Sequence, residues 1–151
     1  MIINRYIIIY IFIMNYLIKN LNILSKSSNL NNFNNIIKLF DSINTIDISK
    51  YKINEPKTYE KVIIHKNNYY ELVLINWEKG AFTNYHDHPR NGCVLKVLDG
   101  KLYEKSENSS KTLIKNSVNF KLGNEFHQII AIDKSYSLHY YSPPNYYDNN
   151  L

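Results

Sequence analysis

The sequence predicts a mainly β domain, a small barrel or sandwich with helices packed on its outside. From residue 59 onward, short segments rich in β-branched and aromatic residues follow one another, separated by turn-forming residues. Asp99-Gly100 is typical of a two-residue hairpin turn. The expected strands cover residues 61–65, 69–77, 93–99, 101–105, 112–115, 117–120, 127–132 and 136–142. Strands of this number and length fit a closed or two-layered sheet whose interior holds one small ligand.

The segment before the strands is predicted to be helical. Between residues 15 and 43, apolar side chains recur at spacings of three and four, which predicts two short amphipathic helices. A polar stretch at 25–32 separates them, and we expect both helices to cover the outside of the β core. Residues 47–57 are expected to form a connector, because Pro56 disfavours a regular element there.

Residues 1–14 are predicted to be an apolar N-terminal extension. The apolar run at 6–14 is shorter than the ~20 residues that a membrane-spanning helix needs, so we expect no membrane association. Two interpretations stay open: a targeting segment that begins around Arg5, or a misassigned start with Met14 as the true one. Residues 15–151 are predicted to be a single domain, with helices in 15–43 and the barrel in 59–144.

Composition narrows the function classes. The chain has 151 residues, enough for one domain with a real core, and 44% of them are hydrophobic. Its net charge of +5 comes from scattered lysines, whereas nucleic-acid binding needs a clustered basic surface, so we expect no nucleic-acid partner. Cys93 is the only cysteine, which excludes an internal disulfide and favours a reducing, cytoplasmic location. We expect a monomer.

Three histidines form a candidate metal site. On an extended strand, His86 and His88 point to the same face, and His127 opens a later strand from which its ring can reach them. Three neutral imidazoles leave coordination positions open for a substrate. The alternative is a solvated strand end and an unrelated buried histidine. Glu125 is a second alternative, as the carboxylate of a two-histidine site, although we favour a turn position for it.

The spacing around these histidines resembles a family motif. Gly80, His86, His88, Cys93 and Gly100 fit G-x5-H-x-H-x4-C-x6-G, which resembles the first cupin motif with cysteine in place of the usual glutamate ligand. That replacement is a mark of the cysteine dioxygenase family. Residues 59–77 and SLHYYSPP at 137–144 resemble the same family. The resemblance implies a cupin-type small β-barrel or jelly roll.

The resemblance also implies a chemistry. It assigns Fe(2+) to His86, His88 and His127, with a small-molecule thiol and O2 as the reactants. It places Tyr141 beside the iron, where it can form a thioether with Cys93, and it implies a cis peptide bond at Ser142-Pro143. Without the resemblance, a buried inert thiol is the usual state of a lone cysteine.

Ser137, His139 and Tyr141 can also be interpreted from their spacing. Their period of two places them on one face of a strand. A serine hydroxyl can orient an imidazole that hydrogen-bonds a phenol, so the three residues can form a relay. The alternative is an ordinary amphipathic strand with an outward polar face.

Lys61 departs from the family pattern. The family has an arginine two residues after the tyrosine that matches Tyr59, and that arginine clamps the substrate carboxylate. Lys61 keeps the charge but loses the planar two-pronged geometry, and a related thiol dioxygenase group has glutamine there. The alternative for Lys61 is a solvated strand lysine. Trp77 and Phe126 are expected to be core walls rather than substrate contacts.

The sequence therefore predicts an iron(II)-dependent thiol dioxygenase that oxidises L-cysteine to cysteine sulfinate. A first alternative is a dioxygenase of another small thiol, 3-mercaptopropionate or cysteamine. A second is a zinc or nickel cupin that acts as an isomerase or hydrolase, since three histidines also suit zinc. A third is a cupin without catalytic activity.

Overall fold

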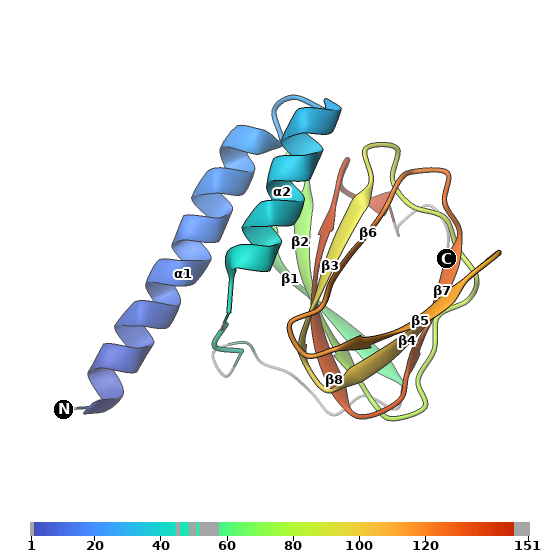
Figure 1. Cartoon of the computed structure of the whole chain (residues 1–151). Coiled ribbons are helices and arrows are strands. Elements are labelled where there is room, and N and C mark those ends of the chain that lie inside the picture. The colour runs from blue at the N-terminus through green and yellow to red at the C-terminus, as the bar shows by residue number, and fades with distance from the viewer. Residues whose placement is uncertain (1, 45, 49–50, 52–57, 147–151) are drawn as a thin grey trace.

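The computed structural model describes residues 2–44, 46–48, 51 and 58–146, with side chains from residue 12 onward. Two helices precede eight strands in this part of the chain (Figure 1). The elements are α1 (Ile2–Leu24), α2 (Leu30–Ser42), β1 (Tyr59–Lys66), β2 (Glu71–Trp77), β3 (Cys93–Asp99), β4 (Lys101–Ser106), β5 (Ser110–Ile114), β6 (Val118–Lys121), β7 (His127–Ala131) and β8 (Ser135–Tyr141). Every predicted strand is present, with bounds shifted by a few residues.

The strands form two antiparallel sheets. The larger sheet has five strands in the order β1-β2-β8-β3-β6, and the smaller has three in the order β5-β4-β7. In Figure 1 the two sheets face each other and enclose a common interior, while both helices lie on the outside of the larger sheet. The predicted small β-barrel with helices packed outside is therefore confirmed.

The central strands of the larger sheet, β2, β8 and β3, are buried on both faces, so they contribute to two cores. Alternation along β2 sends Val73 and Ile75 into the barrel interior with Trp77. Leu72 takes the other face and packs with the helices, as does Tyr140 of β8. This explains why β2 is apolar almost throughout instead of alternating between apolar and polar residues.

The helices differ from the prediction at one end. α1 begins at Ile2, not near residue 15, whereas the predicted break between the helices is present at 25–29. The separation of residues 1–14 from the domain stays a prediction. Of the predicted connector 47–57, residues 49–50 and 52–57 lie outside the described part of the chain. Within the described residues, no helix has both the length and the apolar character that crossing a membrane requires.

α2 is fixed to the barrel at its C-terminus. The side chain of Lys96 on β3 is 1% exposed, and its ammonium donates to the carbonyls of Phe40 at 2.9 Å and Asp41 at 3.3 Å. Carbonyls at a helix C-terminus lack partners within the helix and carry partial negative charge, so they suit a cation. At the other end, Asn29 caps α2 by accepting from the Asn32 amide at 2.8 Å.

Candidate active site

His86 and His88 lie on an irregular segment between β2 and β3, not on an extended strand as predicted. Isolated bridges pair Phe82 with Ile130 and His86 with His127, which attach the segment to the edge of β7. His86 and His127 exchange two backbone hydrogen bonds of 2.9 Å, so the two residues are direct neighbours. Tertiary pairing, rather than strand alternation, therefore sets the direction of these side chains.

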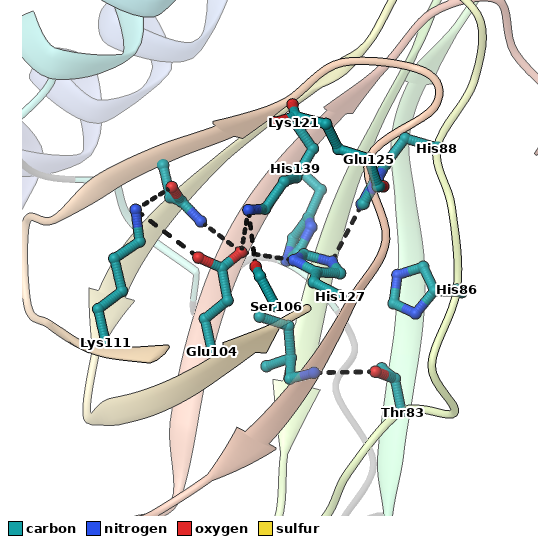
Figure 2. Close-up of polar contacts among 12 residues, drawn as sticks. Thr83, His86, His88, Glu104, Ser106, Lys111, Lys121, Glu125, His127 and His139 are labelled. Carbon is teal, nitrogen blue, oxygen red and sulfur yellow. Dashed lines mark hydrogen bonds and ion pairs between the residues drawn. The ribbon is translucent and has the colours of Figure 1, made fainter. Parts of the chain in front are cut away.

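The three predicted ligands converge. Their ring centroids lie 4.4 to 5.2 Å apart, and one nitrogen from each ring lies within 4.8 Å of the others. His88 and His127 are buried and His86 is half-buried. Figure 2 shows the rings of His86, His88 and His127 gathered at one side of the barrel interior. The expected convergence of His127 on the H-x-H pair is correct.

Hydrogen bonds determine which nitrogen of each ring is available. Each Nδ1 faces an oxygen that can only accept: the Asn84 carbonyl lies 2.8 Å from His86, the Glu125 carbonyl 2.8 Å from His88, and the Glu104 carboxylate 2.5 Å from His127. At each of the three histidines, a neutral ring therefore carries its proton on Nδ1. The three Nε2 lone pairs are left for a metal ion.

This donor set fits a divalent transition metal. The Nε2 atoms of His88 and His127 lie 3.0 Å apart, a separation that suits two adjacent ligands of one cation. Burial lowers the pKa of His86 to about 4 and that of His88 to about 3. Both rings are therefore neutral ligands at pH 7.

Glu104 is a site residue that the sequence interpretation missed. Its side chain is 2% exposed, and besides His127 it contacts Asn119, Lys121 and Lys111. Burial by itself raises the pKa of Glu104, but the hydrogen bond with His127 and the neighbouring positive charges lower it to about 2. The sequence does contain an indication of this role. Glu104 lies two residues after Leu102, so both side chains point to the buried face of the strand, and a charged group buried there needs a partner.

Glu125 occupies a turn, as we favoured. Its carboxylate accepts from the backbone amide of Leu122 at 2.5 Å, while its backbone carbonyl accepts from His88. Among the described residues, the cluster that could hold a metal ion consists of the three histidines. The two-histidine, one-carboxylate alternative is therefore not formed.

Ser137, His139 and Tyr141 form the predicted chain of hydrogen bonds on β8. Ser137 Oγ lies 2.7 Å from His139 Nε2, and Tyr141 Oη lies 2.9 Å from His139 Nδ1. The indole of Trp77 donates to Ser137 Oγ at 2.8 Å, which favours donation by the serine to His139 Nε2. His139 Nδ1 then donates to Tyr141, and burial keeps the pKa of His139 well below its ordinary value.

Tyr141 is also a direct neighbour of Cys93. The two residues are paired across β3 and β8, and their side chains share a hydrogen bond. With His139 donating to its oxygen, Tyr141 can donate its own proton toward the sulfur. Burial raises the pKa of the Cys93 thiol above its ordinary range.

One cavity of about 400 Å³ connects these groups. It is lined by the ring of His86, by His127, by Cys93 and Tyr141, and by the ammonium-bearing chain of Lys61. A cavity of this size lies within the range of small-molecule sites. His86 and His127 of the candidate metal site therefore face the same space as His139 and Tyr141 of the hydrogen-bonded chain.

Comparison with known proteins identifies the family. The family model of cysteine dioxygenase type I matches residues 14–149. This chain belongs to the cysteine dioxygenase type I family. The family resemblance expected from the H-x-H-x4-C spacing and SLHYYSPP is confirmed.

Individual relatives are distant. Cysteine dioxygenase type 1 of Homo sapiens is 26% identical over 109 residues, which cover 62% of this chain and 54% of the human protein. The Danio rerio protein is 27% identical over 138 residues, 80% of this chain and 68% of its own length. The chain thus spans about half the length of the first of these relatives.

Solved structures support the fold alone. An RmlC-like cupin from Shewanella frigidimarina has a TM-score of 0.56 at 18% identity, covering 62% of this chain and 83% of its own. KdgF from Halomonas has a TM-score of 0.55 at 17% identity, covering 60% and 85%. The cupin-type barrel that the sequence predicted is therefore the observed architecture.

In this member of the cysteine dioxygenase family, Lys61 faces the cavity. Its strand pairs it with the inward-facing Ile75, and its ammonium lies 5.8 Å from the ring centre of Tyr59. Burial lowers the pKa of Lys61 to about 8, although Glu71 and Cys93 counteract the shift. Lys61 is therefore not the solvated lysine of the alternative interpretation.

The two aromatic residues expected in the core behave differently. Trp77 is 1% exposed and packs against Tyr59 with ring centroids 5.0 Å apart, as expected. Phe126 is 48% exposed and stacks on Tyr85 at 6.0 Å beside the cavity, so its prediction as a core wall was wrong. Phe126 lies in the segment just before β7 and lines the cavity from its rim.

Proposed function

We propose that this chain is an iron(II)-dependent thiol dioxygenase that converts L-cysteine and O2 to cysteine sulfinate. The observation that carries the proposal is one cavity lined by His86 and His127, two of the three converging histidines, and by the hydrogen-bonded pair Cys93 and Tyr141. Membership of the cysteine dioxygenase family supports the reaction class. Both oxygen atoms of O2 end on the substrate sulfur, so the reaction needs no organic co-substrate.

His86, His88 and His127 would hold the metal through Nε2. Bound iron(II) supplies a Lewis acid for a substrate thiolate and the redox chemistry that lets O2 react with it. All three protein ligands are neutral, and neutral ligands leave the ion its full charge for an anionic sulfur. The residues present thus suit a thiol substrate.

Lys61 would bind the substrate carboxylate. Its ammonium chain lines the same cavity as His86 and His127, and a single charged contact fixes the orientation of a small amino acid. Because lysine lacks the planar fork of arginine, it holds a carboxylate with less geometric selectivity. This supports testing 3-mercaptopropionate and cysteamine beside cysteine. Tyr59 would form a wall of this pocket.

Tyr141 would act as the hydrogen-bond donor of the cavity, with His139 and Ser137 as the residues that hold it. The distances of 2.7 and 2.9 Å along the chain restrict the phenol to one orientation. Such a preorganised donor stabilises negative charge that develops on oxygen during the reaction.

Cys93 and Tyr141 would also form a thioether. The S–C bond would join Cys93 Sγ to a carbon of the Tyr141 ring, with loss of the thiol hydrogen and a ring hydrogen. The two electrons released would pass to O2, which the proposed reaction already uses. A protein two hydrogens lighter in intact-mass measurement would identify the bond.

The test combines metal analysis with product analysis. The protein is loaded with iron(II) without oxygen, then given O2 with cysteine, cysteamine and 3-mercaptopropionate in parallel, and products are measured by mass spectrometry. We expect cysteine sulfinate with matching O2 uptake. Iron-loaded protein that forms no sulfinate from any of the three would overturn the proposal. Turnover with zinc or nickel and no oxygen requirement would instead support the hydrolase or isomerase alternative.

A further inference from the structure

One oxygen of Glu104 carries an unusual number of donors (Figure 2). Oε1 accepts from His127 Nδ1 at 2.5 Å and from the Asn119 amide at 2.8 Å, and the Lys121 ammonium lies 3.3 Å away. Oε2 faces Lys111 at 3.6 Å. The oxygen that polarises the candidate metal ligand His127 is therefore shared with an amide and a cation.

The positions of these donors are fixed by further contacts. Lys111 donates to Asn119 Oδ1 at 2.6 Å, which leaves the Asn119 amide group directed at Glu104. The side chain of Lys121 is 13% exposed and donates to Ser106 Oγ at 3.0 Å. Lys121 therefore lies in a defined place beside the carboxylate and is not a mobile surface charge.

His127 differs from the other two candidate ligands in the group that accepts its Nδ1 hydrogen bond. The Nδ1 atoms of His86 and His88 donate to neutral backbone carbonyls, whereas that of His127 donates to a carboxylate. A carboxylate acceptor draws the ring proton toward itself and makes the imidazole a stronger electron donor to a metal. An oxygen that is already paired with an ammonium draws that proton less strongly.

We propose that Lys121, acting through Glu104, is a positioning residue that limits the electron donation of His127 to the metal ion. The ion then keeps more of its positive charge for an anionic ligand such as a thiolate. The inference rests on the proposed function only in requiring that the three histidines bind a divalent metal.

The test uses Co(2+), with azide as the anionic ligand. Co(2+) affinity is measured by competition with a chromophoric chelator, and azide affinity by the absorption bands of the bound ion. We expect Lys121→Met to bind Co(2+) about tenfold more tightly, the lower limit of outer hydrogen-bond effects at metal sites, and to bind azide more weakly. Lys121→Arg, which keeps the charge, should restore the values of the unmodified protein.

Lys115→Met is the matched control. It removes the same charge from an exposed pair with Asp99, at 3.7 Å. An equal shift in Lys115→Met, or no tightening in a folded Lys121→Met, would overturn the inference. If Lys121→Met does not fold, Lys121→Gln gives the same comparison. Failure of the unmodified protein to bind Co(2+) would instead overturn the metal site of the proposed function.

Discussion

The Nε2 atoms of His88 and His127 lie 3.0 Å apart, although the hydrogen bonds of both rings assign their protons to Nδ1. Two Nε2 lone pairs at this distance suit adjacent positions around one cation. A cation held by them binds the folded chain and not the unfolded one, so metal binding and folding are coupled at this site.

Metal binding should therefore raise thermal stability. Excess Co(2+) or anaerobic iron(II) should stabilise the protein by about 2.7 kcal/mol at one hundred times its dissociation constant, a rise of several degrees in Tm. His86→Ala should abolish the rise, because it removes a ligand. His65→Asn is the control, since His65 packs on Tyr70 away from the cluster. An equal rise in His86→Ala would contradict the assigned ligand set.

Acid should destabilise the metal-free protein before its carboxylates titrate. The folded pKa values of about 4 for His86 and about 3 for His88 lie below the ordinary 6.5, so the unfolded chain binds more protons in that interval. Stability is then fully present above pH 6.5 and is lost as the pH falls toward the folded values. Urea unfolding at pH 7, 6 and 5 with a chelator should show falling midpoints, and His88→Asn should flatten the dependence.

The pH dependence of substrate affinity should reveal Lys61. Because burial lowers its pKa to about 8, KM for 3-mercaptopropionate should rise above that pH as the ammonium loses its proton. Cysteamine has no carboxylate and serves as the internal reference for thiol ionisation. Lys61→Arg should keep the affinity for 3-mercaptopropionate at high pH, because arginine stays charged. Identical KM profiles for the two thiols would remove Lys61 from substrate binding.

Lys96 should matter for stability and not for chemistry. Lys96→Met removes the donor to the Phe40 and Asp41 carbonyls at the end of α2, and should lower the free energy of unfolding by about 1–2 kcal/mol. Chemical unfolding measures the loss, and Co(2+) affinity should stay unchanged. The exposed Lys115→Met should leave stability nearly unaltered.

Local patterns predicted the strands and the β8 chain, because side-chain alternation acts within one strand. Ser137, His139 and Tyr141 needed only a period of two to be placed on one face. The start of α1 was missed because residues 6–14 are almost wholly apolar, so they show no polar face from which a helical period is recognised.

Contacts between separate elements could not be predicted from local sequence patterns. Glu104 reaches His127 from the neighbouring strand, and Lys121 approaches from the other sheet, so neither pairing leaves a spacing in the sequence. His86 and His88 were correctly predicted to lie close together, but the expected cause, alternation along an extended strand, was wrong. They lie on a segment held by pairing with β7, a tertiary contact that overrides the expected strand.

Tyr141→Phe should separate metal binding from turnover. Phenylalanine keeps the ring that fills the cavity wall but removes the hydroxyl that His139 holds at 2.9 Å. We expect kcat to fall by about a hundredfold, because the variant loses the hydroxyl that stabilises negative charge developing on oxygen. Co(2+) affinity should stay unchanged, and no thioether should form. Tyr140→Phe is the matched control: its hydroxyl bonds Ser25 at 2.9 Å on the helix side of the same strand, so it should cost stability and not kcat. An undiminished kcat in Tyr141→Phe would assign the donor role to another residue of the cavity.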